Sequence, residues 1–194
     1  MRMRRLLVAP AVLLLVGLTA LPAEASTVTI SGFSFLPSPL KVAQGATVNW
    51  HNNDGVNHTS TQDSPLRLWN TGNIPSGATS SSVTLRASGS YPYHCAIHGG
   101  MTSNVKVPIK VLPRTGSPST TFTITLASAT QLGFTYDIQK KVGTGSFAVW
   151  KTGVTSRTVT FSGSIGTYSF RSRLHRTSNG ATSGWSPAKT ITIS

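Results

Sequence analysis

The feature that most constrains the fold of this chain is a repeated pattern of short alternating runs. After the first 25 residues, apolar side chains recur at every second position rather than at helical spacing, and clusters of Gly, Pro, Asn and Ser separate the runs. Val48 and Trp50 are one such pair, and Val105 and Val107 belong to the clearest run. Alternation of this kind predicts strands with one buried face, and the spacing of the turn residues predicts an all-β sandwich or barrel.

A stretch rich in Pro, Ser, Thr and Gly divides the chain into two β regions. Residues 112–118 have the composition of a linker. We therefore expect one domain over residues 26–111 and a second over residues 119–194. Pro108 lies inside the last run of the first region, and because proline cannot donate to a strand ladder, it predicts an edge strand or a bulge there.

The amino-terminal residues have the composition of an export signal. Residues 1–25 begin with three arginines in the first five positions, continue with an apolar stretch over residues 6–21, and end with an Ala-Glu-Ala motif at 23–25. This order predicts a cleaved signal peptide and a secreted or otherwise extracytoplasmic protein. We expect no membrane span after cleavage; a retained membrane anchor is the alternative.

The chain is strongly basic, with 17 lysines and arginines against four acidic residues and a formal net charge of +13. The basic residues are dispersed through the strand-like runs, and the signal segment aside, Lys140-Lys141 is the longest block. We therefore do not expect nucleic-acid binding, for which a clustered basic patch would be typical. We expect a solvated basic surface that meets an acidic redox partner or an acidic cell-envelope surface.

The single cysteine, Cys95, lies on a predicted turn together with His98 and Met101. One cysteine cannot form an internal disulfide, so a metal ligand, a buried free thiol and an intermolecular bridge are the options. A thiolate, an imidazole and a thioether at three-residue intervals have the spacing of metal ligands. Soft sulfur donors favour copper, and two histidines and a cysteine with a weak axial methionine form a blue-copper site. His58 is the leading candidate for the second histidine.

Residues 26–111 resemble a small cupredoxin of the plastocyanin and amicyanin type. The resemblance implies a Greek-key sandwich that binds one type 1 copper ion through His58, Cys95, His98 and Met101 and that transfers single electrons. Two glycines follow the loop histidine, where the family often has proline. The motifs that carry the resemblance are Val48-x-Trp50, Asn53-Asp54, His58-Thr59 and Gly89-Ser90-Tyr91-x-Tyr93-x-Cys95-x-x-His98-x-x-Met101.

Residues 119–194 resemble a fibronectin type III module, which is an immunoglobulin-like β-sandwich. The resemblance implies a spacer or adhesion module without catalytic residues. Leu126 stands where such a module usually places a core tryptophan. The segments that carry the resemblance are Tyr136-x-Ile138-x-Lys140, Thr167-Tyr168-x-Phe170-x-Ser172-Arg173 and Gly184-Trp185-Ser186-Pro187.

Taken together, these patterns predict an exported, copper-binding electron carrier that is not an enzyme. A cysteine nucleophile would need a histidine base and a third group to orient it, and no acidic residue stands out for that role. The five histidines are too few for a multicopper oxidase. The remaining alternatives are copper capture or delivery without a redox circuit, an adhesion protein with a degenerate copper site, and zinc on the same ligands. The partner would be a redox protein or a copper donor or acceptor.

The remaining polar residues near the expected ligands are assigned from their positions. Asn57 and Thr59 flank the first histidine and are expected to support the site. His51, His94 and His175 are expected at the surface, because strand alternation turns the first two away from the core and the third has no partner nearby in sequence.

Overall fold

The protein is described by a computed structural model that covers residues 25–63 and 65–194. Within these residues the chain forms sixteen β-strands and no helix, which confirms the expectation of an all-β protein. None of the described segments can therefore cross a membrane as a helix. The predicted signal peptide over residues 1–25 lies outside the described residues, except for Ala25, where the first strand begins.

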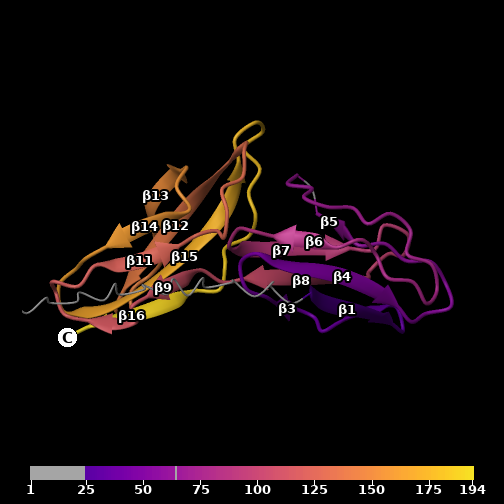
Figure 1. Ribbon diagram of the computed structural model, residues 1–194, viewed down its shortest axis with the longest axis horizontal. Coiled ribbons are helices and arrows are strands. Elements are labelled where there is room, and N and C mark those ends of the chain that lie inside the picture. Colours follow the sequence, from indigo (N-terminus) through magenta and orange to yellow (C-terminus); the bar gives the residue numbers. More distant parts are fainter. Residues whose placement is uncertain (1–24, 64) are drawn as a thin grey trace, which may run out of the picture.

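Strands β1 to β8 make up the first sandwich, which consists of two four-stranded sheets (Figure 1). One sheet has the order β2-β1-β4-β6 and the other has the order β3-β8-β7-β5. Strand β1 runs parallel to β4, so the chain must cross between these neighbours rather than turn back in a hairpin. The strands are Ala25–Ser31 (β1), Ser34–Leu36 (β2), Leu40–Lys41 (β3), Ala46–Asn52 (β4), Thr61–Gln62 (β5), Val83–Leu85 (β6), Gly89–His94 (β7) and Thr102–Val107 (β8).

Aromatic side chains hold the two sheets of the first sandwich together. Every second residue of β4 is buried, as the alternation of Val48 and Trp50 predicts. The Trp50 ring meets the Tyr93 ring of the opposite sheet edge to face, with 5.5 Å between centroids. The Phe35 ring contacts Tyr93 at 4.7 Å in the same way. Such pairs add to the stabilisation that comes from burying these large apolar side chains.

Strands β9 to β16 make up the second sandwich. Its larger sheet has the order β10-β16-β15-β12-β13, and its smaller sheet has the order β14-β11-β9. The Phe161 ring of the smaller sheet meets Phe170 at 5.0 Å and Trp150 at 5.8 Å across the core. The strands are Lys110–Leu112 (β9), Thr115–Gly116 (β10), Phe122–Thr125 (β11), Phe134–Val142 (β12), Ala148–Val154 (β13), Thr158–Phe161 (β14), Gly166–Arg176 (β15) and Lys189–Ile193 (β16).

The segment around the expected linker is paired rather than free. The alternating run of the sequence is divided at Pro108, so that β8 stays in the first sandwich and β9 pairs with β11 of the second. Within the predicted linker 112–118, β10 pairs with β16. Pro108 lies where the chain leaves one sheet for the next, and β9, which follows it, is the edge strand of the smaller sheet, as the proline predicts. The domain limits drawn from the sequence stay a prediction.

Short polar contacts join the two sandwiches. Ser90 and Gly184 exchange two backbone hydrogen bonds of 2.9 Å each, and the Arg176 guanidinium donates to the Leu66 carbonyl oxygen at 2.7 Å. The approach is so close that a Cβ on Gly89 would lie 2.6 Å from Oγ of Ser183. A side chain at this position would force Ser183 of the second sandwich or Tyr91 of the first to shift, so glycine suits this close approach.

Two strands of the first sandwich lead from this junction to the opposite end of the molecule. Strand β4 begins beside the second sandwich, where Gln44 donates to the Thr125 carbonyl oxygen at 2.9 Å, and it points away from that sandwich in Figure 1. Strand β7 likewise begins at Gly89 beside the second sandwich and ends at His94. The loops that follow β4 and β7 contain His58 and Cys95, so these residues lie at the end far from the second sandwich.

Candidate metal centre

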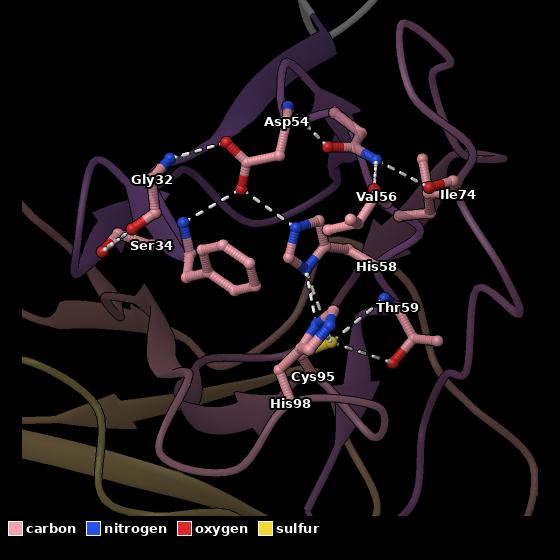
Figure 2. A network of polar contacts seen from close by, with 11 residues as sticks. Gly32, Ser34, Asp54, Val56, His58, Thr59, Ile74, Cys95 and His98 are labelled. Carbon is pink, nitrogen blue, oxygen red and sulfur yellow. Dashed lines mark hydrogen bonds and ion pairs between the residues drawn. The ribbon is translucent and has the colours of Figure 1, made fainter.

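Three side chains with metal-binding atoms converge at this end of the first sandwich. The Sγ atom of Cys95 lies 3.7 Å from Nδ1 of His58 and 3.6 Å from Nδ1 of His98. The two Nδ1 atoms are 3.1 Å apart. Figure 2 shows both imidazoles directed at the sulfur. Within the described residues, this is the one group of three or more His, Cys, Asp or Glu side chains arranged to hold a metal ion.

The size of this triangle fits a first-row metal ion. A point at equal distance from the three donor atoms lies about 2 Å from each, which is comparable with the length of a zinc–imidazole bond. The donors are two borderline nitrogens and one soft sulfur, and this set favours copper over calcium or magnesium. The arrangement predicted for His58, Cys95 and His98 is therefore present in the structure, and copper is the cofactor that it fits.

The first histidine is fixed by its backbone. His58 follows β4 and forms an isolated bridge with Ile74, with hydrogen bonds of 3.1 and 2.7 Å in the two directions. The side chain of Asn52, at the end of β4, donates to the Ile74 carbonyl oxygen at 2.8 Å. These contacts hold the loop that contains His58 against the segment that contains Ile74. The His58 side chain is fully buried.

The cysteine loop is short and closes on itself. Cys95 comes directly after β7, and its N–H donates to the carbonyl oxygen of Met101 at 3.0 Å, just before β8 begins. Gly100 has a φ of 81°, a conformation that glycine adopts without steric cost. The loop therefore returns to the sheet within a few residues and places His98 beside the sulfur.

The Cys95 sulfur also accepts hydrogen bonds from Thr59. The Thr59 N–H lies 3.4 Å from Sγ and the Thr59 hydroxyl lies 3.9 Å from it. The same hydroxyl accepts the N–H of Ala96 at 2.7 Å, which ties the first ligand loop to the second. Thr59 thus has the supporting position expected from the sequence, whereas Asn57 is exposed.

A carboxylate orients the buried imidazole. Oδ2 of Asp54 lies 3.0 Å from Nε2 of His58, the ring nitrogen that points away from the sulfur. The carboxylate also accepts the N–H groups of Gly32 and Phe33 at 2.7 and 2.9 Å. The hydrogen bond from the Phe33 N–H is the main reason that the pKa of Asp54 lies below its ordinary value. A carboxylate in this position fixes the tautomer and the ring orientation of a ligand histidine.

The tip of the β1–β2 hairpin covers the two imidazoles. The Phe33 ring meets the rings of His58 and His98 edge to face, with centroids 5.4 and 5.0 Å apart. Phe33 has a φ of 57°, which is uncommon for a residue other than glycine. Half of its surface is nevertheless exposed. The hairpin tip therefore adopts an unfavourable backbone conformation that places an aromatic ring over the site.

Sequence reasoning did not find the roles of Asp54 and Phe33. Asp54 lies four residues before His58, so the spacing alone was a usable signal. The role of Phe33 depends on a hairpin that lies more than twenty residues earlier in the chain. The contact of Phe33 with the site could be located only after the register of β1 against β4 was known.

The other three histidines, which were expected at the surface, are half-buried. His94 bonds to Asp63, His51 bonds to Thr79 and His175 lies near Asp137, so none of the three joins the cluster. The Met101 side chain is buried beside the loop. Its role as an axial ligand stays a prediction.

Comparison with known proteins agrees with the donor set. Residues 23–109 match the family of copper binding proteins that includes plastocyanin and azurin. The first sandwich is a cupredoxin domain. The family match ends before β9, so the second sandwich lies outside it. A search of curated proteins found no match.

Several solved structures are similar to this cupredoxin domain. A reduced Cu(I) form of an amicyanin mutant is 24% identical, with 45% of this chain and 85% of that chain covered and a TM-score of 0.41. A purple cupredoxin from Nitrosopumilus maritimus is 22% identical, with 42% and 98% covered and a TM-score of 0.39. A copper-containing nitrite reductase from Thermus scotoductus is 27% identical, with 48% and 24% covered and a TM-score of 0.41.

Proposed function

We propose that this protein carries single electrons through one type 1 copper ion that His58, Cys95, His98 and Met101 would hold. The observation that carries the proposal is the triangle of one sulfur and two imidazole nitrogens, whose size and softness suit copper. When bound, copper supplies the cycle between Cu(I) and Cu(II). The residues of this chain supply the fixed positions in which that cycle needs little rearrangement.

The surroundings of the donors keep them in place and keep water away. Cys95 and His58 are almost completely buried. Thr59 donates to the Cys95 sulfur, and Asp54 bonds to Nε2 of His58, the ring nitrogen that points away from the site. Side chains fixed in this way do not have to turn when the charge at the site changes. An electron carrier needs a site that rearranges little when the charge of the metal changes. A hydrolytic metal site has a different need, because it must keep an open position for water or substrate.

His98 is the point where the site approaches the surface. Its ring is half-buried, in contrast to the fully buried His58. Two exposed apolar side chains lie close by, since Ile97 precedes His98 in the chain and Phe33 packs against the His98 ring. We therefore assign electron exchange with a redox partner protein to this end of the molecule.

The protein is proposed to be a carrier and not an enzyme. The described residues offer one metal-binding cluster, and a coupled multicopper centre would need further imidazoles at hydrogen-bonding or bridging distance. The other described histidines are engaged elsewhere, with Asp63, Thr79 or Asp137 as their neighbours.

The second sandwich is proposed to be a fibronectin type III module that serves as a spacer, and the chain is proposed to be exported. The facing sheets of residues 110–193 and their aromatic core support the module. The basic, apolar and small-residue order of residues 1–25 supports export.

Retention of copper in both oxidation states is the test that separates a carrier from a delivery protein. The full chain is loaded with copper, and dissociation is followed against a chelator before and after reduction. A carrier retains the ion in both states and gives reversible voltammetry. His51→Gln is the matched control, because His51 is half-buried and bonds only to Thr79. Rapid loss of copper on oxidation would contradict the carrier role and would favour Cu(I) delivery.

A further inference from the structure

A row of alternating cations and aromatic rings crosses the second sandwich. The Lys141 ammonium lies 5.6 Å from the centre of the Phe147 ring, and the Arg171 guanidinium lies 4.2 Å from the centre of the same ring. Arg171 also lies 5.4 Å from the Trp185 ring, which Arg173 approaches to 4.7 Å. These five residues, Lys141, Phe147, Arg171, Trp185 and Arg173, form the cation–aromatic row. All four distances are within the range of cation–π attraction.

The row lies on the face of the large sheet that points away from the core. Along β15, Arg171 and Arg173 alternate with the buried residues Phe170, Ser172 and Leu174. Since successive side chains of a strand point to opposite faces, both arginines belong to the outer face. Every member of the row is half-buried, so part of each side chain remains exposed to solvent.

Almost no negative charge balances this face. Residues 119–194 contain eight lysines and arginines against one acidic residue, Asp137. Asp137 is almost completely buried and accepts from the Gly153 N–H at 3.1 Å and from Nε of Arg173 at 3.0 Å. The other two described carboxylates, Asp54 and Asp63, bond to histidines of the first sandwich. Within the described residues, no carboxylate pairs with Lys141 or Arg171.

The rings hold the arginines in a conformation that suits anion binding. The Arg171 guanidinium lies within cation–π distance of both Phe147 and Trp185, and a guanidinium held in this way can donate two hydrogen bonds to a phosphate or a carboxylate. Burial lowers the pKa of Arg171, but a guanidinium keeps its charge near neutral pH. Nε of Arg171 also donates to Gln139 at 2.8 Å. Side chains that are already ordered lose little further entropy on binding.

We propose that the cation–aromatic row is a docking surface for a linear anionic polymer, with phosphate or carboxylate groups on a sugar or polyol backbone. The inference does not depend on copper. A row of separate charges matches the repeated anions of an extended chain better than it matches a compact ligand. A nucleic acid is disfavoured, because the ring faces are occupied by cations and are not free to stack on bases.

The test measures binding of the full chain to defined polymers at several salt concentrations. The probes are poly(glycerol phosphate), polygalacturonate and single-stranded DNA of matched charge. The first two distinguish phosphate from carboxylate as the preferred group, and either result supports the proposal. Affinity should fall steeply with added salt, as for any polyanion that displaces counterions. Tighter binding of DNA than of both other polymers, or no binding at low salt, would overturn it.

Two variants separate the row from the general positive charge. Lys141→Gln with Arg171→Gln should weaken polymer binding at least about tenfold, because two charges of the row are lost. Lys41→Gln with Lys110→Gln removes the same charge from exposed lysines outside the row and should change the affinity less than about twofold. Equal losses in the two double variants would show that net charge alone attracts the polymer.

A third variant keeps every charge. Phe147→Ala removes the ring between Lys141 and Arg171 and should still weaken binding about threefold or more, since the guanidinium loses its fixed orientation. Phe147 is half-buried outside the strands, so the sheet should tolerate the change. Unchanged affinity in this variant, with an unchanged thermal midpoint, would contradict an organised row.

Discussion

The two sandwiches use a similar architecture in different ways. In the first, side chains from the loops after β4 and β7 converge on one point at the end of the sheets, where two of the three are buried and His98 is half-buried. In the second, charged side chains are spread along the outer face of β12 and β15. Loops at a strand end can bring distant residues within bonding distance of one ion, whereas a sheet face spaces its residues in a row. The first arrangement suits a small cofactor, and the second suits an extended partner.

Loss of a ligand should have the largest effect, and only the first sandwich should show it. His58→Gln should lower copper affinity by at least about 100-fold, because ligand loss should exceed the effect of losing a supporting residue. His94→Gln is the control, since His94 adjoins Cys95 but bonds to Asp63. Competition with a chelator of known affinity measures both. If the two variants bind copper equally, the ligand assignment is wrong.

The buried acid of the second sandwich should affect stability and leave copper unchanged. Asp137→Asn removes the charge that Arg173 and Gly153 contact and should lower the free energy of unfolding by about 2 kcal/mol. Asp63→Asn changes an exposed polar contact with His94 and should cost less than about 0.5 kcal/mol. Denaturant titrations provide the values. A change in the copper spectrum of Asp137→Asn would mean that the two sandwiches are coupled.

The carboxylate behind the ligand should have a smaller effect on copper than the ligand itself. Asp54→Asn keeps the size of the side chain but weakens the contact with Nε2 of His58, so copper affinity should fall about tenfold. Asp63→Asn changes the charge of the protein equally and contacts no ligand. A loss of affinity as large in Asp63→Asn would assign the effect to net charge rather than to ring orientation.

Removal of the covering ring should be the mildest of these changes. Asparagine tolerates the positive φ of Phe33, so Phe33→Asn should leave the free energy of unfolding within about 0.5 kcal/mol. The reduction potential should fall, because water near the site stabilises the more highly charged Cu(II) form. Leu36→Asn, at a similarly exposed apolar residue of the same hairpin, serves as the control. Voltammetry that shows equal shifts for both variants would remove any special role for Phe33.

The parts of this molecule that depend on local pattern could be predicted from the sequence, and those that depend on strand register could not. The alternation around Trp50 predicted its strand, and the spacing of Cys95 and His98 predicted neighbouring donors. The contact of Asp54 with the tip of the β1–β2 hairpin depends on how β1 pairs with β4. The passage of the chain between sandwiches at Pro108 depends in the same way on long-range pairing.

The cation–aromatic row shows the same limit. Each basic residue was visible in the sequence, but its neighbours were not. Arg171 lies opposite Gln139 and Arg173 lies opposite Asp137 only because of the pairing of β12 with β15. A dispersed set of charges in the sequence therefore became one surface in the fold.

The central claim is that Cys95 binds copper as a thiolate together with His58 and His98. Titration of the full chain with Cu(II), followed by visible absorption and electron paramagnetic resonance, tests it most directly. The wild-type protein should take up one equivalent, with intense visible absorption and narrow hyperfine splitting, and Cys95→Ser should lose both features. An identical spectrum in Cys95→Ser, or no copper uptake by the wild-type protein, would contradict the account.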